Sequence, residues 1–177
     1  MTSMETADRE QLLRFLNASR KKLIESSEGL TDEQAKMRPA EDRWSVLECV
    51  EHTALVEDGM FSTLSTKMVP AEVEHDRARE QQFIRGTADR SRKIDAPDGV
   101  RPAGKFATLA DALAHFESSR ARTIDYISKC DLDLRGQTIS HPRLGVLSGQ
   151  EFMIILALHP SRHALQILET REALGLD

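Results

Sequence analysis

The stretch FMIILALHPSRHALQI, residues 152–167, decides how this chain folds. Some of its positions follow the alternating spacing of three and four residues that places side chains on one face of a helix. These positions are Phe152, Leu156, His159, His163 and Ile167. The spacing predicts a helix whose apolar face, with both histidines on it, points into a helical bundle. Histidines four residues apart lie one above the other, on successive turns.

The ends of this helix are marked in the sequence. The segment Ser148-Gly149-Gln150-Glu151 has the spacing of a capping box, and Gly175 supplies a stop at the other end. Inside the helix, Pro160 removes one backbone donor and crowds the preceding turn. We therefore expect a kink or a loosened turn beside His159, which serves either packing or the direction in which that histidine points.

Three more long helices are expected from apolar periodicity and capping residues. Ser45 opens a second capping box before an apolar run, and this helix should end before Pro70. A helix over residues 6–27 precedes it, and another begins at Thr108. A short helical turn begins at Thr31, which opens a further capping box. No segment shows the sustained alternation that is typical of a strand.

The connections between these helices complete the expected architecture. Residues 67–107 form a long crossover between the second and third long helices, with a short helix near 80–90. Residues 134–147 are expected to be irregular. Four amphipathic helices with one long crossover predict an all-α four-helix bundle, and the length of the chain favours a single domain over 1–177.

Composition excludes several classes of protein. The formal net charge of −5 argues against a general nucleic-acid binder. The longest apolar run is far shorter than the ~20 residues that a membrane-spanning helix needs, so we expect no membrane association. The two cysteines form no close pair and the first residues do not resemble a signal peptide. These features indicate a cytoplasmic protein.

The histidines suggest a metal centre. His159 and His163 are placed to converge on one ion, although the same spacing is compatible with a pair of packed core histidines. His52 lies in the middle of the second long helix, and two facing helices that supply one and two histidines would make a site with three ligands. Three ligands leave coordination positions open, which is the arrangement of catalytic rather than structural zinc sites. A metal-free bundle with packed histidines remains the alternative.

Other residues near these positions have more than one interpretation each. Gln166 shares the face of the paired histidines and either holds a ligand ring or makes an interhelical contact, and Glu48 either orients His52 or only caps its helix. Cys49 is either a soft ligand or a small buried residue. Arg162 pairs with an acidic residue, holds an anionic substrate or, most commonly for arginine, is solvated. Trp44 packs before the helix or lines the site. The remaining histidines are expected to be structural or at the surface: His75, His115 and His141.

Two motifs together resemble the DinB/YfiT-like superfamily. WSVLECVEH, residues 44–52, is similar to its tryptophan-to-histidine motif, and HPSRHALQI, residues 159–167, is similar to its second signature, a histidine pair followed by glutamine. The resemblance implies a four-helix bundle with up-down-down-up connections, a homodimer, and a divalent metal on His52, His159 and His163. Family members include transferases and isomerases that use low-molecular-weight thiols, metal-dependent hydrolases, and proteins without an assigned role.

The first hypothesis is therefore a metal-dependent enzyme whose ion activates a thiol or a water. Its substrate would be a small molecule, with a low-molecular-weight thiol as a candidate, and the ligands do not decide between S-transfer and hydrolysis. Three imidazoles suit zinc, nickel, copper and iron alike, so the metal stays open. The second hypothesis is a non-enzymatic, metal-binding and dimerising module associated with stress.

Overall fold

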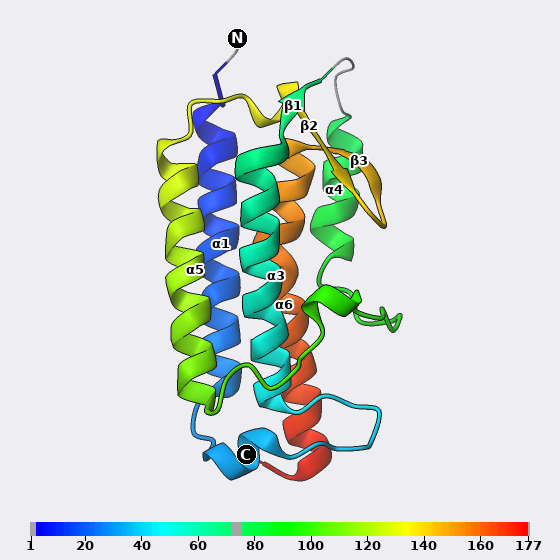
Figure 1. The fold of residues 1–177 in the computed structure, drawn as a ribbon. Coiled ribbons are helices and arrows are strands. Elements are labelled where there is room, and N and C mark those ends of the chain that lie inside the picture. Colours follow the sequence, from blue (N-terminus) through cyan, green and yellow to red (C-terminus); the bar gives the residue numbers. More distant parts are fainter. Residues whose placement is uncertain (1–2, 72–75, 177) are drawn as a thin grey trace.

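The computed structural model describes residues 3–71 and 76–176, and its frame is a bundle of four long helices. They are α1 (Thr6–Ser27), α3 (Val46–Lys67), α5 (Leu109–Lys129) and α6 (Gly149–Leu174). Each long helix packs against two of the others, α1 and α3 both lying between α5 and α6. Figure 1 shows α1 and α6 running in one direction and α3 and α5 in the other. The four-helix bundle that the sequence predicts is confirmed.

The helices begin and end at the residues that the sequence marks. Ser45 and Ser148 each form a complete capping box, and the Thr108 side chain accepts from a backbone N–H in the first turn of α5. The short helix α2 (Asp32–Lys36) also starts at its predicted capping box. At the end of α6, Gly175 has a φ of 64°, the left-handed conformation that glycine adopts at little cost.

A small antiparallel sheet corrects the expectation of an irregular segment at 134–147. Strands β2 (Gln137–His141) and β3 (Gly145–Ser148) form a hairpin after the 3-10 turn η2 (Leu134–Gly136). Strand β1 (Val69–Pro70) pairs with the other edge of β2, so the order is β1-β2-β3. These strands are too short for an alternating pattern to stand out in the sequence.

The crossover from α3 to α5 contains two further elements. Helix α4 (Arg77–Gly86) begins and ends slightly earlier than the predicted 80–90 and packs against α6. The chain then passes through the 3-10 turn η1 (Asp98–Val100), which contacts α3, before it reaches α5 (Figure 1). The crossover therefore covers the side of the bundle formed by α3 and α6.

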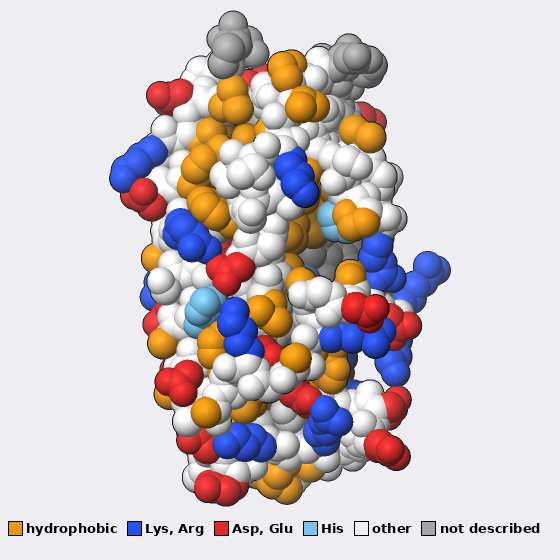
Figure 2. Space-filling view, viewed as in Figure 1, with side chains coloured by type: hydrophobic (Ala, Val, Ile, Leu, Met, Phe, Trp, Pro, Cys, Tyr) orange, Lys and Arg blue, Asp and Glu red, His pale blue; other side chains and the backbone are white. Residues whose placement is uncertain are grey.

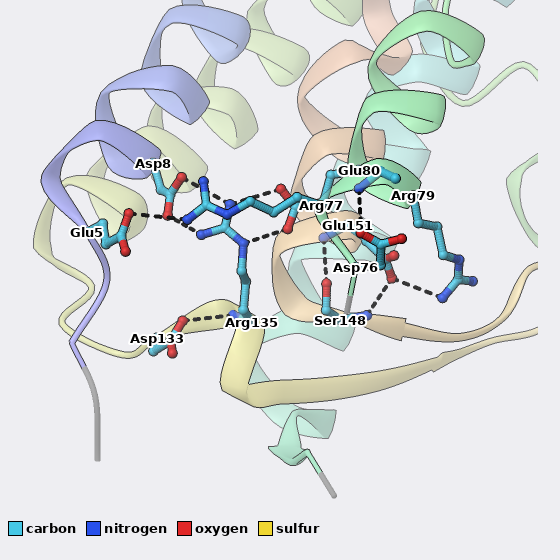
Figure 3. Close-up of polar contacts among 11 residues, drawn as sticks. Glu5, Asp8, Asp76, Arg77, Arg79, Glu80, Asp133, Arg135, Ser148 and Glu151 are labelled. Carbon is cyan, nitrogen blue, oxygen red and sulfur yellow. Dashed lines mark hydrogen bonds and ion pairs between the residues drawn. The ribbon is translucent and has the colours of Figure 1, made fainter. Parts of the chain in front are cut away.

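A buried ionic network fixes α4 to the bundle (Figure 3). The guanidinium of Arg135 donates to both carboxylate oxygens of Glu80, on α4, at 2.6 and 2.8 Å, and also to the carboxylate of Asp8, on α1. The three side chains are only 12%, 5% and 10% exposed, in that order. These hydrogen bonds raise the pKa of Arg135, so the group stays charged. The network joins the start of α1, the crossover and the segment before β2.

The surface and core have a simple organisation. Acidic and basic side chains are intermixed over the face shown in Figure 2, and hydrophobic side chains gather toward the end where the strands lie. The core consists of two hydrophobic clusters, and along α6 the first includes Phe152 and Ala157 and the second includes Ile167. His159 and His163 lie between them in the sequence of α6. Among the described residues, no helix has the length and apolarity needed to cross a membrane.

Candidate metal centre

Three histidines meet between α3 and α6. One ring nitrogen from each of His52, His159 and His163 lies within 4.8 Å of those of the other two. The Nε2 atoms of His159 and His163 are 3.1 Å apart, and the His52 ring centroid is 5.2 Å from that of His159 and 4.6 Å from that of His163. The structure therefore brings together the three histidines that the sequence singled out, from two neighbouring helices.

The outer ring nitrogens show that two of the rings are oriented toward this cluster. The Nδ1 atom of His52 lies 2.6 Å from the carbonyl oxygen of Val100, and the Nδ1 atom of His163 lies 3.0 Å from the amide oxygen of Gln166. Because these oxygens only accept, each Nδ1 donates, and a neutral imidazole has one N–H. The lone pair is then on Nε2, as in metal-binding histidines with an oriented outer nitrogen.

The environment keeps the cluster neutral. Burial lowers the pKa of His52 and brings those of His159 and His163 well below the usual value of 6.5. The pKa values of His159 and His163 are lowered further because protonated rings so close together would repel each other. Neutral imidazole is the form that binds a metal ion.

The donor set suits a divalent metal. Three imidazole nitrogens can hold an ion and leave positions for other ligands, as in catalytic zinc sites. Within residues 3–71 and 76–176, this is the one group of three or more histidine, cysteine or carboxylate side chains gathered in this way. The residues present therefore fit the ion that the sequence predicts.

The neighbouring candidates on α3 have other partners. Glu48 completes the capping box with the backbone N–H of Ser45 at 2.8 Å and forms an ion pair with Arg38. Cys49 is fully buried in the second hydrophobic cluster, where burial raises the pKa of its thiol. The ring of Trp44 lies 4.9 Å from that of His52, centroid to centroid, so it lines the site.

Arg162 differs from the solvated side chain that the sequence favoured. It is only 7% exposed, and its Nη2 atom donates to the carbonyl oxygen of Arg92 at 2.8 Å. The crossover causes this burial, because Arg92 belongs to the segment that lies over α6. Sequence periodicity could not indicate this contact, since the two residues are 70 positions apart.

The other two histidines among the described residues lie outside the cluster, as expected. His115 contacts the carboxylate of Asp58 at 2.7 Å, between α5 and α3. The Nδ1 atom of His141 accepts from two backbone N–H groups of the β2–β3 turn, those of Arg143 and Leu144. His75 is outside the described residues.

Three residues that support the centre, Glu51, Val100 and Arg90, were missed by the sequence reasoning. Glu51, buried beside His52, accepts from the backbone N–H groups of Ala103 and Lys105 at 2.7 and 3.1 Å. Together with the contact between His52 and Val100, this holds the crossover next to the histidines. Arg90 contacts Gln166 from the same crossover. The only signal for these contacts in the sequence was that Glu51, an acidic residue, is next to His52, a predicted ligand. The residues that they contact in the crossover lie in irregular segments, which have no periodic pattern to predict them.

Comparison with known proteins supports this fold. The model of the DinB superfamily matches residues 8–167. The chain is 21% identical over 158 residues to the "Uncharacterized protein YuaE" of Bacillus subtilis, a match that covers 89% of this chain and 96% of YuaE.

Solved structures share the architecture. YfiT from Bacillus subtilis, described as a probable metal-dependent hydrolase with an unusual four-helix bundle topology, matches with a TM-score of 0.61 and 17% identity over 100% of this chain and 93% of YfiT. The four-helix bundle protein TT2238 gives a TM-score of 0.57 and 22% identity, over 96% and 99% of the two chains. A conserved protein from Enterococcus faecalis gives a TM-score of 0.66 and 17% identity, over 98% of this chain and 99% of that protein. At these identities the likeness establishes the fold.

Proposed function

Because the chain belongs to the DinB superfamily, we propose that it is a metal-dependent enzyme with a divalent cation held by His52, His159 and His163. The observation that carries the proposal is the convergence of three neutral imidazoles, two of which, His52 and His163, are buried and have their outer nitrogens engaged by carbonyl oxygens. When bound, the cation lowers the pKa of a coordinated water or thiol and so supplies a nucleophile near neutral pH.

The residues of the chain itself prepare this site. Val100 and Gln166 accept from the Nδ1 atoms of two of the histidines and thereby direct the Nε2 lone pairs inward. Trp44 forms an aromatic wall against the ring of His52. The crossover, held by Glu51, covers the centre and limits access of solvent. Such a site favours a small-molecule substrate.

Hydrolysis is the first reaction that we propose, because the structurally similar YfiT is described as a probable metal-dependent hydrolase. Transfer to or from a low-molecular-weight thiol would use the same ligands, so it belongs to the same test. We further propose that the protein is cytoplasmic and forms a homodimer. The two free, buried cysteines support a reducing compartment. Sedimentation analysis of the purified protein tests whether it is a dimer.

Metal binding is tested first, on protein purified without a histidine tag. We expect near-stoichiometric binding of zinc or nickel by the wild type, and a large loss of affinity in each of the variants H52A, H159A and H163A. H115A is the matched control, because His115 lies outside the cluster and its removal should leave metal binding unchanged. Equal affinity in the wild type and H163A would reject the site.

Activity is then measured on the metal-loaded protein. Ester and amide substrates test hydrolysis, and cytoplasmic thiols with electrophiles test S-transfer. Turnover that depends on added metal and disappears in H163A supports the enzyme. Tight metal binding with no turnover in either screen would instead support the non-enzymatic metal-binding module.

A further inference from the structure

Arg90 connects the crossover to the outer side of the metal centre. Its side chain is 19% exposed, and its Nε and Nη2 atoms donate to the two carboxylate oxygens of Glu169 at 2.7 and 2.6 Å. Its remaining Nη1 atom donates to the amide oxygen of Gln166 at 3.2 Å. The same amide oxygen lies 3.0 Å from Nδ1 of His163. Four side chains thus form one continuous chain of hydrogen bonds that ends at a predicted ligand.

The donors and acceptors in this chain permit only one arrangement. A guanidinium can only donate, so the Gln166 amide must turn its oxygen, and not its NH2 group, toward Arg90. That oxygen then also faces His163, whose Nδ1 must be the protonated nitrogen. Since a neutral imidazole has a single N–H, Nε2 of His163 is left with its lone pair directed at the cluster.

We propose that Arg90 is a positioning residue that selects the Nδ1–H tautomer of His163 by fixing the orientation of the Gln166 amide. Without Arg90, the amide is free to rotate by a half turn and to present its NH2 group to Nδ1 of His163. The proton of the ring then moves to Nε2, the nitrogen that faces His159. This inference rests on the proposed function only for the use of the lone pair, because the tautomer exists in the metal-free protein.

The fold should tolerate removal of the Arg90 guanidinium. Glu169 keeps a second cationic partner, Arg43, at 3.7 Å, so its carboxylate is not left without an ion pair. Arg20 provides a matched control, since it donates through Nε and Nη2 to Glu117 between α1 and α5, away from the histidines.

The experiment records the ¹⁵N resonances of the histidine rings in the metal-free, full-length protein at mildly alkaline pH. We expect the Nδ1–H form of His163 in the wild type and in Arg20→Met, and conversion toward the Nε2–H form in Arg90→Met. The double variant Arg90→Met/Gln166→Glu should restore the Nδ1–H form, because a carboxylate can only accept. A loss of folding stability alone would not produce this rescue.

Zinc titration of the same proteins provides an independent readout. Arg90→Met should weaken binding about 10- to 100-fold, the effect typical of outer-shell partners, and the double variant should recover part of the loss. An unchanged Nδ1–H form in Arg90→Met would overturn the inference about Arg90. Failure of the wild type to bind zinc or nickel would overturn the proposed function but leave the tautomer result intact, so the two failures are distinguishable.

Discussion

His159 differs from the other two histidines in what its ring nitrogens contact. Its Nε2 atom lies 3.1 Å from Nε2 of His163, which carries a lone pair, so His159 is the donor in the metal-free protein. Its Nδ1 atom is buried and has no hydrogen-bond partner among the described residues. Two of the histidines are thus prepared for a metal ion, whereas the third holds its proton on the nitrogen that faces the cluster.

Zinc should therefore affect the three rings unequally. We expect the ring proton of His159 to move from Nε2 to Nδ1 on zinc binding, so that Nε2 can bind the ion, while His52 and His163 keep their Nδ1 protons against Val100 and Gln166. The ¹⁵N spectra of the metal-free and zinc-loaded proteins measure this difference directly. A change of tautomer at His163 in the same titration would contradict it.

The histidines also make the metal-free protein sensitive to acid. Burial lowers the pKa values of His159 and His163 in the folded state well below 6.5, the value in the unfolded chain. Below about pH 6.5 the unfolded state therefore binds more protons, and each histidine can reduce the free energy of unfolding by about 1.4 kcal/mol per pH unit. Urea denaturation of the metal-free wild type and of H163Q should diverge as the pH falls, with the variant less sensitive; parallel curves would contradict this assignment.

At the scale of elements, the turn of α6 around Pro160 is supported from outside the helix. Pro160 has no N–H, so the carbonyl oxygen of Leu156 lacks the donor that a regular helix supplies. The Nη2 atom of Arg120, from α5, lies 3.3 Å from that oxygen. The next carbonyl oxygen, that of Ala157, accepts from the hydroxyl of Ser19 at 2.5 Å. Side chains of neighbouring helices thus donate hydrogen bonds to the carbonyl oxygens of the turn that precedes His159.

Arg120 has a second role as the partner of a buried carboxylate. Its guanidinium lies 2.8 Å from Glu57, and both side chains are almost fully buried. R120M should lower the free energy of unfolding by about 3–5 kcal/mol, because it leaves the buried carboxyl group of Glu57 without its cationic partner. The double variant R120M/E57M should recover much of this loss, since it removes both charges. Chemical denaturation measures the stability of the single and the double variant. The control is R20M, which breaks the partly exposed ion pair of Arg20 with Glu117 and should cost about 1 kcal/mol or less.

The elements also show how far sequence reasoning extends. Capping boxes at Ser45 and Ser148 act over three residues, so the starts of α3 and α6 could be predicted closely. The histidine pair on α6 was equally visible, because its spacing is local. The contacts of the crossover were not, since Glu51 meets Ala103, a residue of an irregular segment, at a separation of 52 positions. Local periodicity carries no information on such a pairing.

At the scale of the whole molecule, the network around Arg135 joins elements far apart in the chain (Figure 3). R135M leaves the mostly buried carboxylates of Asp8 and Glu80 without this cation. We expect the free energy of unfolding to fall by about 3–5 kcal/mol, the usual cost of breaking a buried pair. Limited proteolysis should also cut the crossover near α4 faster than in the wild type. Unchanged denaturation and cleavage would show that the network contributes little.

A metal ion that binds only the folded chain stabilises the whole molecule. At a free zinc concentration 100 times the Kd, the free energy of unfolding should rise by about 2.7 kcal/mol. A chelator should reverse the effect, and H163A should show none of it. Thermal unfolding with and without zinc provides the measurement; equal stabilisation of H163A would indicate binding elsewhere on the protein.

The placement of the histidines on α3 and α6 also has a consequence for synthesis on the ribosome. A growing chain carries His52 long before His159 and His163, which belong to the last long helix. Until α6 has left the ribosome and docked against α1 and α3, a single imidazole is all that the emerging centre can offer. One imidazole binds a metal ion weakly, so we expect any loading of the centre to follow the docking of α6 rather than to precede it.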